Sequence, residues 1–359
     1  MVGEPASPAE VTRCVEDAVA ICEIPAPTGE EGDRAARVAA QLREAGLDAE
    51  LDANGSVLAG RPGAGQEGAI VVAAHLDTVF ADVREIRVRR RGSVLHAPGI
   101  GDNSLGVAGL LFLARRLREG GRPVVLAATV GEEGLGNLRG ARGIVDALAP
   151  VEFVALEGGG ARQLVTQGVG SARLRLTTTT AGGHSWQDRG RPSALHVLIA
   201  LLAELAAGPG TASFNVGELH GGAGINVLAP EANATVEFRD LDTARLDAAV
   251  ERLHAAAAGV AGVRVDVATL GRRPGGTVAG DHPLVRDALL AFEAAGAPRP
   301  ALAASSTDAN AALGAGIPAV TVGLAESAEV HALDERVDVA GLPASLSALA
   351  GLIARRTAA

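Results

Sequence analysis

Three short apolar segments constrain this chain more than any other feature of its sequence. They span residues 69–74, 123–130 and 152–156, and each is followed, directly or one residue later, by a side chain that can bind a metal. Their length suits a buried strand, and helical patterns separate them, so we expect an α/β fold with a mostly parallel central sheet. Ligands bind beyond the carboxyl ends of such strands. The side chains at these ends are therefore the first candidates for a functional site.

The candidate side chains together match the needs of a two-metal hydrolase. Two divalent ions about 3.5–4 Å apart need a bridging carboxylate, and each ion needs an imidazole and a further carboxylate. One more carboxylate must stay off the metals, to take the proton of the attacking water and pass it to the leaving amine. Each residue alone has an ordinary explanation, such as a helix cap for Asp102. Their occurrence together in one chain is what predicts a metal site. The residues of this site are His75, Asp77, Asp102, Glu132, Glu133, Glu157 and His331.

Residues 168–272 have a different pattern from the rest of the chain. They alternate as strand, helix, strand, strand, helix, strand, which is the split βαβ arrangement of an α+β domain. We therefore predict an inserted ferredoxin-like domain at 168–272, within a discontinuous catalytic domain at 1–167 and 273–359. The inserted strands are expected at 171–180, 213–220, 232–239 and 263–270, with helices at 192–207 and 243–257.

The same patterns predict the remaining elements of the catalytic domain. Helices are expected at 8–22, 30–45, 104–118, 282–294 and 340–355, and further strands at 85–90, 94–96 and 319–322.

Composition and charge exclude several classes of partner. The formal net charge is −10 and only 2% of residues are aromatic. Both values argue against binding to nucleic acid or to an anionic membrane. Cys14 and Cys22 are expected to be buried thiols of a reducing compartment. The polar segment 1–10 shows no secretory signal, so we expect a cytoplasmic protein.

The order of the motifs resembles metallopeptidase family 20, a family of dizinc amidohydrolases with a zinc-exopeptidase-like catalytic domain. The motifs are His-x-Asp-Thr at 75–78, Gly-x-x-Asp-Asn at 99–103, Gly-Glu-Glu-Gly at 131–134, an acid at 157 before three glycines, and a late histidine at 331. The resemblance implies two Zn²⁺ ions, with Co²⁺ or Mn²⁺ as substitutes. It assigns His75, Asp102 and Glu157 to one ion, and Asp102, Glu133 and His331 to the other. Glu132 is then the general base and acid, and Asp77 orients His75.

The inserted domain carries further motifs of this resemblance, which implies that it is a lid through which the chain forms a homodimer. Gly-Gly-His-Ser at 182–185 includes His184, and the resemblance implies that this histidine reaches from the lid of a partner subunit and donates to the oxyanion of the substrate. Asn226 and Arg239 match substrate-binding positions, and a guanidinium suits a free carboxylate. Trp186, beside His184, is expected to pack within the domain.

The motifs leave the substrate and the class of enzyme open. The lid motifs favour a tripeptidase or dipeptidase, whereas Glu157, rather than Asp, favours an aminoacylase or desuccinylase acting on an N-acyl amino acid. One alternative is a dizinc aminopeptidase of family 28 or 42, which shares the order of metal ligands. Another is a metal-free binding protein on the same scaffold.

Overall fold

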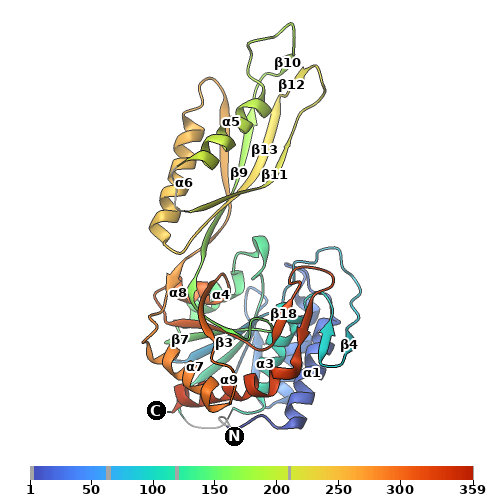
Figure 1. The fold of residues 1–359 in the computed structure, drawn as a ribbon, viewed down its shortest axis with the longest axis vertical. Coiled ribbons are helices and arrows are strands. Elements are labelled where there is room, and N and C mark those ends of the chain that lie inside the picture. Colours follow the sequence, from blue (N-terminus) through green and yellow to red (C-terminus); the bar gives the residue numbers. More distant parts are fainter. Residues whose placement is uncertain (1–3, 62–65, 118–120, 209–211, 359) are drawn as a thin grey trace. The chain divides into compact units, whose positions relative to one another are not determined.

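The computed structural model describes residues 4–61, 66–117, 121–208 and 212–358. The chain divides into two compact units, shown with their elements in Figure 1. The first unit consists of Met1–Gly168 with Thr277–Ala359, and the second is Val169–Gly276.

A mixed sheet forms the centre of the first unit. Among the described residues it has nine strands in the order β1-β2-β6-β3-β7-β17-β8-β15, with β16 paired to β8. The four strands β6, β3, β7 and β17 are mutually parallel, whereas β1, β2 and β8 join the sheet by antiparallel pairing. The strands are β1 (Asp48–Leu51), β2 (Val57–Gly60), β3 (Ile70–His75), β6 (Val124–Thr129), β7 (Glu152–Glu157), β8 (Gln163–Gly168), β15 (Gly276–Thr277), β16 (Ala301–Ser305) and β17 (Ala319–Gly323).

The register of the parallel strands brings their carboxyl ends to one edge. His75 at the end of β3 lies opposite Thr129 at the end of β6, and Glu157 at the end of β7 lies opposite Gly323 at the end of β17. The predicted mostly parallel sheet is thereby confirmed.

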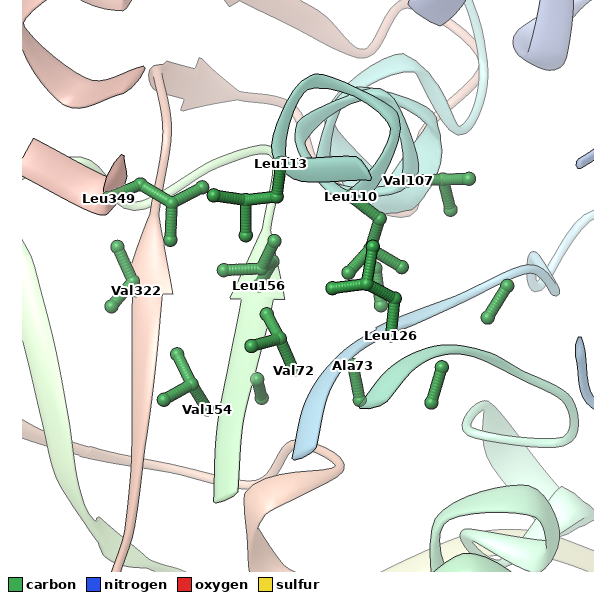
Figure 2. Packing of buried hydrophobic residues seen from close by; sticks show 14 of the residues in the cluster. Val72, Ala73, Val107, Leu110, Leu113, Leu126, Val154, Leu156, Val322 and Leu349 are labelled. Atoms are coloured by element: carbon green, nitrogen blue, oxygen red, sulfur yellow. The ribbon is translucent and has the colours of Figure 1, made fainter. Parts of the chain in front are cut away.

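Helix α3 (Leu105–Ala114) covers the parallel strands and is buried along its whole length. It contacts β3, β6 and β7. Figure 2 shows its apolar side chains directed at those of the sheet, so the start of this helix is held firmly at the carboxyl edge. The labelled side chains include Val107, Leu110 and Leu113 of the helix and Val72, Val154 and Leu156 of the sheet.

The other helices of this unit complete two layers around the sheet. Helices α1 (Pro8–Cys22) and α9 (Leu342–Thr357) pack against α3, and α7 (Pro283–Ala294) packs against α9. Helix α2 (Gly32–Glu44) lies on β1 and β2, and α4 (Arg139–Leu148) packs on α8 (Ala309–Gly314), which contacts β7 and β17. None of the helices in the described part of the chain has the length and apolar character needed to cross a bilayer.

A small antiparallel sheet joins two distant segments of the first unit. Its order is β18 (Glu326–Ala328), β19 (Arg336–Asp338), β5 (Val94–His96) and β4 (Arg89–Arg91). It brings the chain after residue 326 against the chain before residue 100.

The second unit is a four-stranded antiparallel sheet with two helices that share one core. The order β11-β13-β9-β14 places β9 and β13 in the middle. Leu174, Leu198, Phe238 and Leu246 lie in that core. The elements are β9 (Gly170–Thr179), α5 (Ala194–Ala207), β11 (Ser213–Gly221), β13 (Glu231–Asp240), α6 (Thr243–Ala258) and β14 (Arg264–Arg273), with a short ribbon of β10 (Gly183–His184) and β12 (Val227–Leu228).

Two predicted elements of the first unit are wrong in extent. The strand predicted at 85–90 is reduced to Arg89–Arg91, because the backbone N–H of Val88 donates to Glu23 instead of to a neighbouring strand. The helix predicted at 104–118 ends at Ala114. Just beyond that end, Arg116 donates to both carboxylate oxygens of Glu10. Residue 118 lies outside the described residues.

A buried ion-pair network ties the last helix to the start of β7. The guanidinium of Arg356 donates to both oxygens of Glu152, at 2.5 and 3.0 Å, and to Asp287 at 2.6 Å. We expect Arg356→Ala to lower the free energy of unfolding by about 3 kcal/mol, because it leaves the buried carboxylate of Glu152 without its partner. Arg355→Ala is the control, since Arg355 is exposed on the same helix. Urea denaturation measures both variants, and equal stabilities would contradict the assigned role of this network.

Candidate metal centre

Three adjacent parallel strands deliver the first four side chains of the site. Strand β3 ends in His75, the segment after β6 carries Glu132 and Glu133, and β7 ends in Glu157. Because β3 lies between β6 and β7, the histidine is flanked by carboxylates on both sides. His75, Glu132 and Glu133 are all nearly inaccessible to solvent.

Asp77 is fully buried and holds the segment that carries the two glutamates. Its carboxylate accepts from the backbone N–H groups of Glu132 and Glu133, both at 2.9 Å, and from the Thr28 hydroxyl. Its main-chain carbonyl lies 3.0 Å from Nδ1 of His75, closer than its carboxylate at 3.6 Å. Nδ1 therefore holds a proton against the main chain of Asp77, and Nε2 is the nitrogen that faces Asp102 and becomes a metal ligand once it loses its proton.

Asp102 lies in an irregular turn, Ile100–Ser104, immediately before α3. The neighbouring Asn103 is fully buried, and its side chain donates to Leu156 O and accepts from Gly158 N, both in the β7 segment. A Cβ on Gly106 would collide with this carboxamide, which explains the glycine there. These contacts fix the turn beside the end of β7.

Glu335 is a residue of this site for which the sequence predicts no role. It is fully buried, and its carboxylate accepts from the backbone N–H groups of Gly99, Gly101 and Asp102, at 2.7–2.9 Å. It follows His331 by four residues. One side chain thus links the turn of Asp102 to the segment of His331. Its only sequence signal is its place beside a predicted ligand.

The two imidazoles face different oxygens of the same carboxylate. Nε2 of His75 lies 2.9 Å from Oδ1 of Asp102, and Nε2 of His331 lies 3.0 Å from Oδ2. Glu157 lies 3.7 Å from His75, and Glu133 lies 3.2 Å from His331. The five predicted metal ligands therefore meet in two groups, which share Asp102: His75, Asp102 and Glu157, and Asp102, Glu133 and His331.

Burial and the neighbouring ionisable groups shift the pKa values of the side chains in this cluster. Burial raises the pKa of Glu157 to about 7, against the opposing effect of His75. Burial also opposes ionisation of Asp102, but the two imidazoles outweigh it and hold the pKa of that carboxyl below its usual range. Hydrogen bonds to Asp102 and Glu133 raise the pKa of His331 to about 10. The protonated imidazoles of His75 and His331 thus balance part of the negative charge of the neighbouring carboxylates.

The donor set fits two divalent cations. It consists of imidazole nitrogens and carboxylate oxygens, which zinc, cobalt and manganese accept. Among the described residues no arginine is paired with Asp102, Glu133 or Glu157, so cations are the partners that would balance these grouped carboxylates. Asp102 suits a bridging position, since each of its oxygens faces a different imidazole.

The other three predicted residues belong to the second unit. His184 pairs with Val227 in the ribbon of β10 and β12, and the backbone carbonyl of Asn226 accepts from Ser185 N. Nδ1 of His184 accepts from the backbone N–H groups of Trp186 and Gln187, so a neutral ring carries its proton on Nε2. His184 and Asn226 are exposed.

Arg239 and Trp186 have different surroundings. The guanidinium of Arg239 donates to both oxygens of Glu237, at 2.8 and 3.1 Å, and thus has a carboxylate partner within the unit. The predicted packing role of Trp186 is wrong, because 72% of the residue is exposed and only the guanidinium of Arg189 stacks on its ring, at 5.1 Å. Cys14 and Cys22 are buried free thiols.

Fold and cluster together define a class: a hydrolase with metal-capable side chains at the carboxyl edge of a mostly parallel sheet. The particular family follows from comparison of the sequence with family models. Residues 71–355 match Peptidase family M20/M25/M40, and the chain belongs to this family. It is a hydrolytic enzyme of a metal-dependent family. The resemblance predicted from the motifs is confirmed, and the family match replaces the alternative of family 28 or 42.

Relatives of known sequence or structure cover nearly the whole chain. A putative succinyl-diaminopimelate desuccinylase of Mycobacterium tuberculosis is 28% identical, over 93% of this chain and 96% of its own. The aminopeptidase PepT of Bacillus cereus has the same fold, with a TM-score of 0.79 and 21% identity. The match covers 96% of this chain and 98% of PepT. A dinuclear metal-binding peptidase of Bacillus subtilis matches with a TM-score of 0.72 and 17% identity. The match covers 98% of this chain and 100% of the peptidase.

The contacts of Glu335 generate a prediction about metal affinity. Glu335→Ala removes the acceptor of three N–H groups around Asp102, and we expect Zn²⁺ affinity to fall by about 10–100-fold. Glu335→Gln keeps one carbonyl oxygen for Gly101 and Asp102 and should lose less. Asp334→Ala is the control, because the neighbouring side chain is exposed. Competition with a chromogenic chelator measures the affinities. Unchanged affinity in folded Glu335→Ala protein would exclude this role.

Proposed function

We propose that this chain is a dizinc amidohydrolase that cleaves an amide bond in a small peptide or an N-acyl amino acid. The observation that carries the proposal is Asp102, whose two oxygens face the Nε2 atoms of His75 and His331. In this proposal His75, Asp102 and Glu157 hold one ion, and Asp102, Glu133 and His331 hold the other. When bound, the ions lower the pKa of a water molecule and polarise the substrate carbonyl.

Glu132 is the proposed general base and acid. A carboxylate oxygen of Glu132 lies within 4.8 Å of ligand atoms of His75 and Glu133, yet Glu132 belongs to neither of the two proposed ligand sets. The proximity suits a group that takes a proton from the attacking water and donates it to the leaving nitrogen. Asp77 positions Glu132 by accepting its backbone N–H, and orients His75 through Nδ1.

The second unit would supply the remaining contacts to the substrate. The proton on Nε2 of His184 suits a donor to the developing oxyanion. Asn226 lies next to it through the Ser185 hydrogen bond and is a second candidate contact. Arg239 pairs with Glu237 through Nε and Nη2, and its remaining N–H groups are the candidates for capturing a substrate carboxylate.

Several finer features complete the proposal. The putative desuccinylase relative and the peptidase structures fit a substrate drawn from N-acyl amino acids, dipeptides or tripeptides. Homodimerisation through the second unit agrees with the exposed edge strand β11. Two buried free thiols agree with a cytoplasmic location. We expect no nucleic-acid or membrane partner.

The role of Glu132 can be separated from metal binding. We expect Glu132→Ala to retain two metal ions per chain and to lose about 100- to 10,000-fold in kcat, because a positioned general base contributes that much. Glu50→Ala is the control, since this exposed glutamate lies on the edge strand β1. Metal analysis and steady-state kinetics give both values. Near wild-type kcat in the Glu132 variant would refute its assignment.

Metal removal tests the whole proposal. Dialysis against a strong chelator should abolish hydrolysis of di- and tripeptides and N-acyl amino acids, and added Zn²⁺, Co²⁺ or Mn²⁺ should restore it. Full activity after complete metal removal would contradict the proposed mechanism.

A further inference from the structure

A pocket in the first unit opens beside the proposed metal ligands. Its volume is about 170 Å³, and Asp102 and Glu157 lie in its wall. It is bounded by β8, β17, the end of β16 and the glycines that follow β7. A cavity of about 150 Å³ accommodates benzene, so this pocket has room for a branched aliphatic or phenyl group.

The lining is uncharged apart from those two proposed ligands. Its side chains are hydroxyls, one carboxamide and two valines, from Ser305, Thr307, Thr321, Ser327, Gln163, Val165 and Val330. Thr307 and Thr321 bond to each other at 2.7 Å, so the hydroxyls deepest in the wall already have partners. The adjacent arginine, Arg162, is not part of the lining and pairs with Glu326 at the surface.

The uncharged lining of the pocket disfavours the binding of a charged group of the substrate. In the proposed function Asp102 and Glu157 are metal ligands, so neither is free to pair with a charged group of the substrate. An anion or a cation placed against the rest of the lining would be desolvated without a charged side chain as its partner. A neutral group faces neither penalty and gains contact with the valines.

We propose that this pocket binds a neutral side chain or acyl group of the substrate, up to the size of a leucine or phenylalanine side chain. The inference rests on the proposed function and narrows its substrate class: a group with a carboxylate at this position, such as a succinyl group, is a poor occupant. Any carboxylate of the substrate must therefore lie outside the pocket.

Gln163 offers a direct test, because its exposed side chain lines the pocket and tolerates a change of charge. Kinetics of the Zn²⁺-loaded enzyme are measured on matched pairs that differ only in charge: Leu against Glu on either side of the scissile bond, and N-butyryl against N-succinyl amino acids. We expect wild type to prefer the neutral member at one position by at least 10-fold in kcat/KM. Gln163→Arg should reduce that ratio by at least 10-fold, whereas Gln163→Leu should preserve it.

A matched control excludes a general effect of added charge. Gln66→Arg makes the same substitution at an exposed glutamine shortly before β3, at the opposite edge of the sheet, and should leave the ratio unchanged. A wild-type preference for acidic groups at both positions, or equal ratios in Gln163→Arg and Gln66→Arg, would overturn the inference and leave the proposed function intact. Hydrolysis of no member of the panel would overturn the proposed function, and this inference with it.

Discussion

The crowding of carboxylates at one edge of a parallel sheet is the constraint on which the rest of the structure depends. Two like charges 4 Å apart repel by about 4 kcal/mol at an effective dielectric constant of 20. The fold nevertheless places Glu132, Glu133 and Glu157 on both sides of His75 and brings Asp102 against it. Such an arrangement is costly without cations and favourable with them. Binding of divalent ions is therefore the physical reason for a cluster that would otherwise oppose folding.

The scaffold around the cluster is rigid because buried contacts fix each ligand-bearing segment. Asp77 holds the Glu132–Glu133 segment, Asn103 fixes the turn of Asp102 against β7, and Glu335 joins that turn to the segment of His331. Helix α3, packed along its length on the sheet, anchors the same turn from the other side. Supporting contacts of this kind hold the ligand side chains in the geometry that a metal ion needs.

The sequence predicts the parallel centre well, because buried strands with metal-capable ends have few alternative explanations. His75, Glu133 and Glu157 follow from that pattern, Asp102 and His331 join them as further metal-capable side chains, and the family motifs divide the five between two ions. The flanking strands β1 and β2 have only four residues each, which is too short for periodicity to reveal them. Glu335 and the neutral pocket depend on contacts between distant segments, which local patterns cannot encode. The exposure of Trp186 does not follow from its sequence, because a large apolar side chain is usually buried.

Anomalous X-ray diffraction at the zinc absorption edge tests the central claim most directly. Crystals of zinc-loaded protein should show two peaks per chain, about 3.5–4 Å apart, on either side of the Asp102 carboxylate. One peak should contact His75 and Glu157, and the other Glu133 and His331. A single peak, or peaks away from Asp102, would contradict the account of a two-metal centre bridged by this residue.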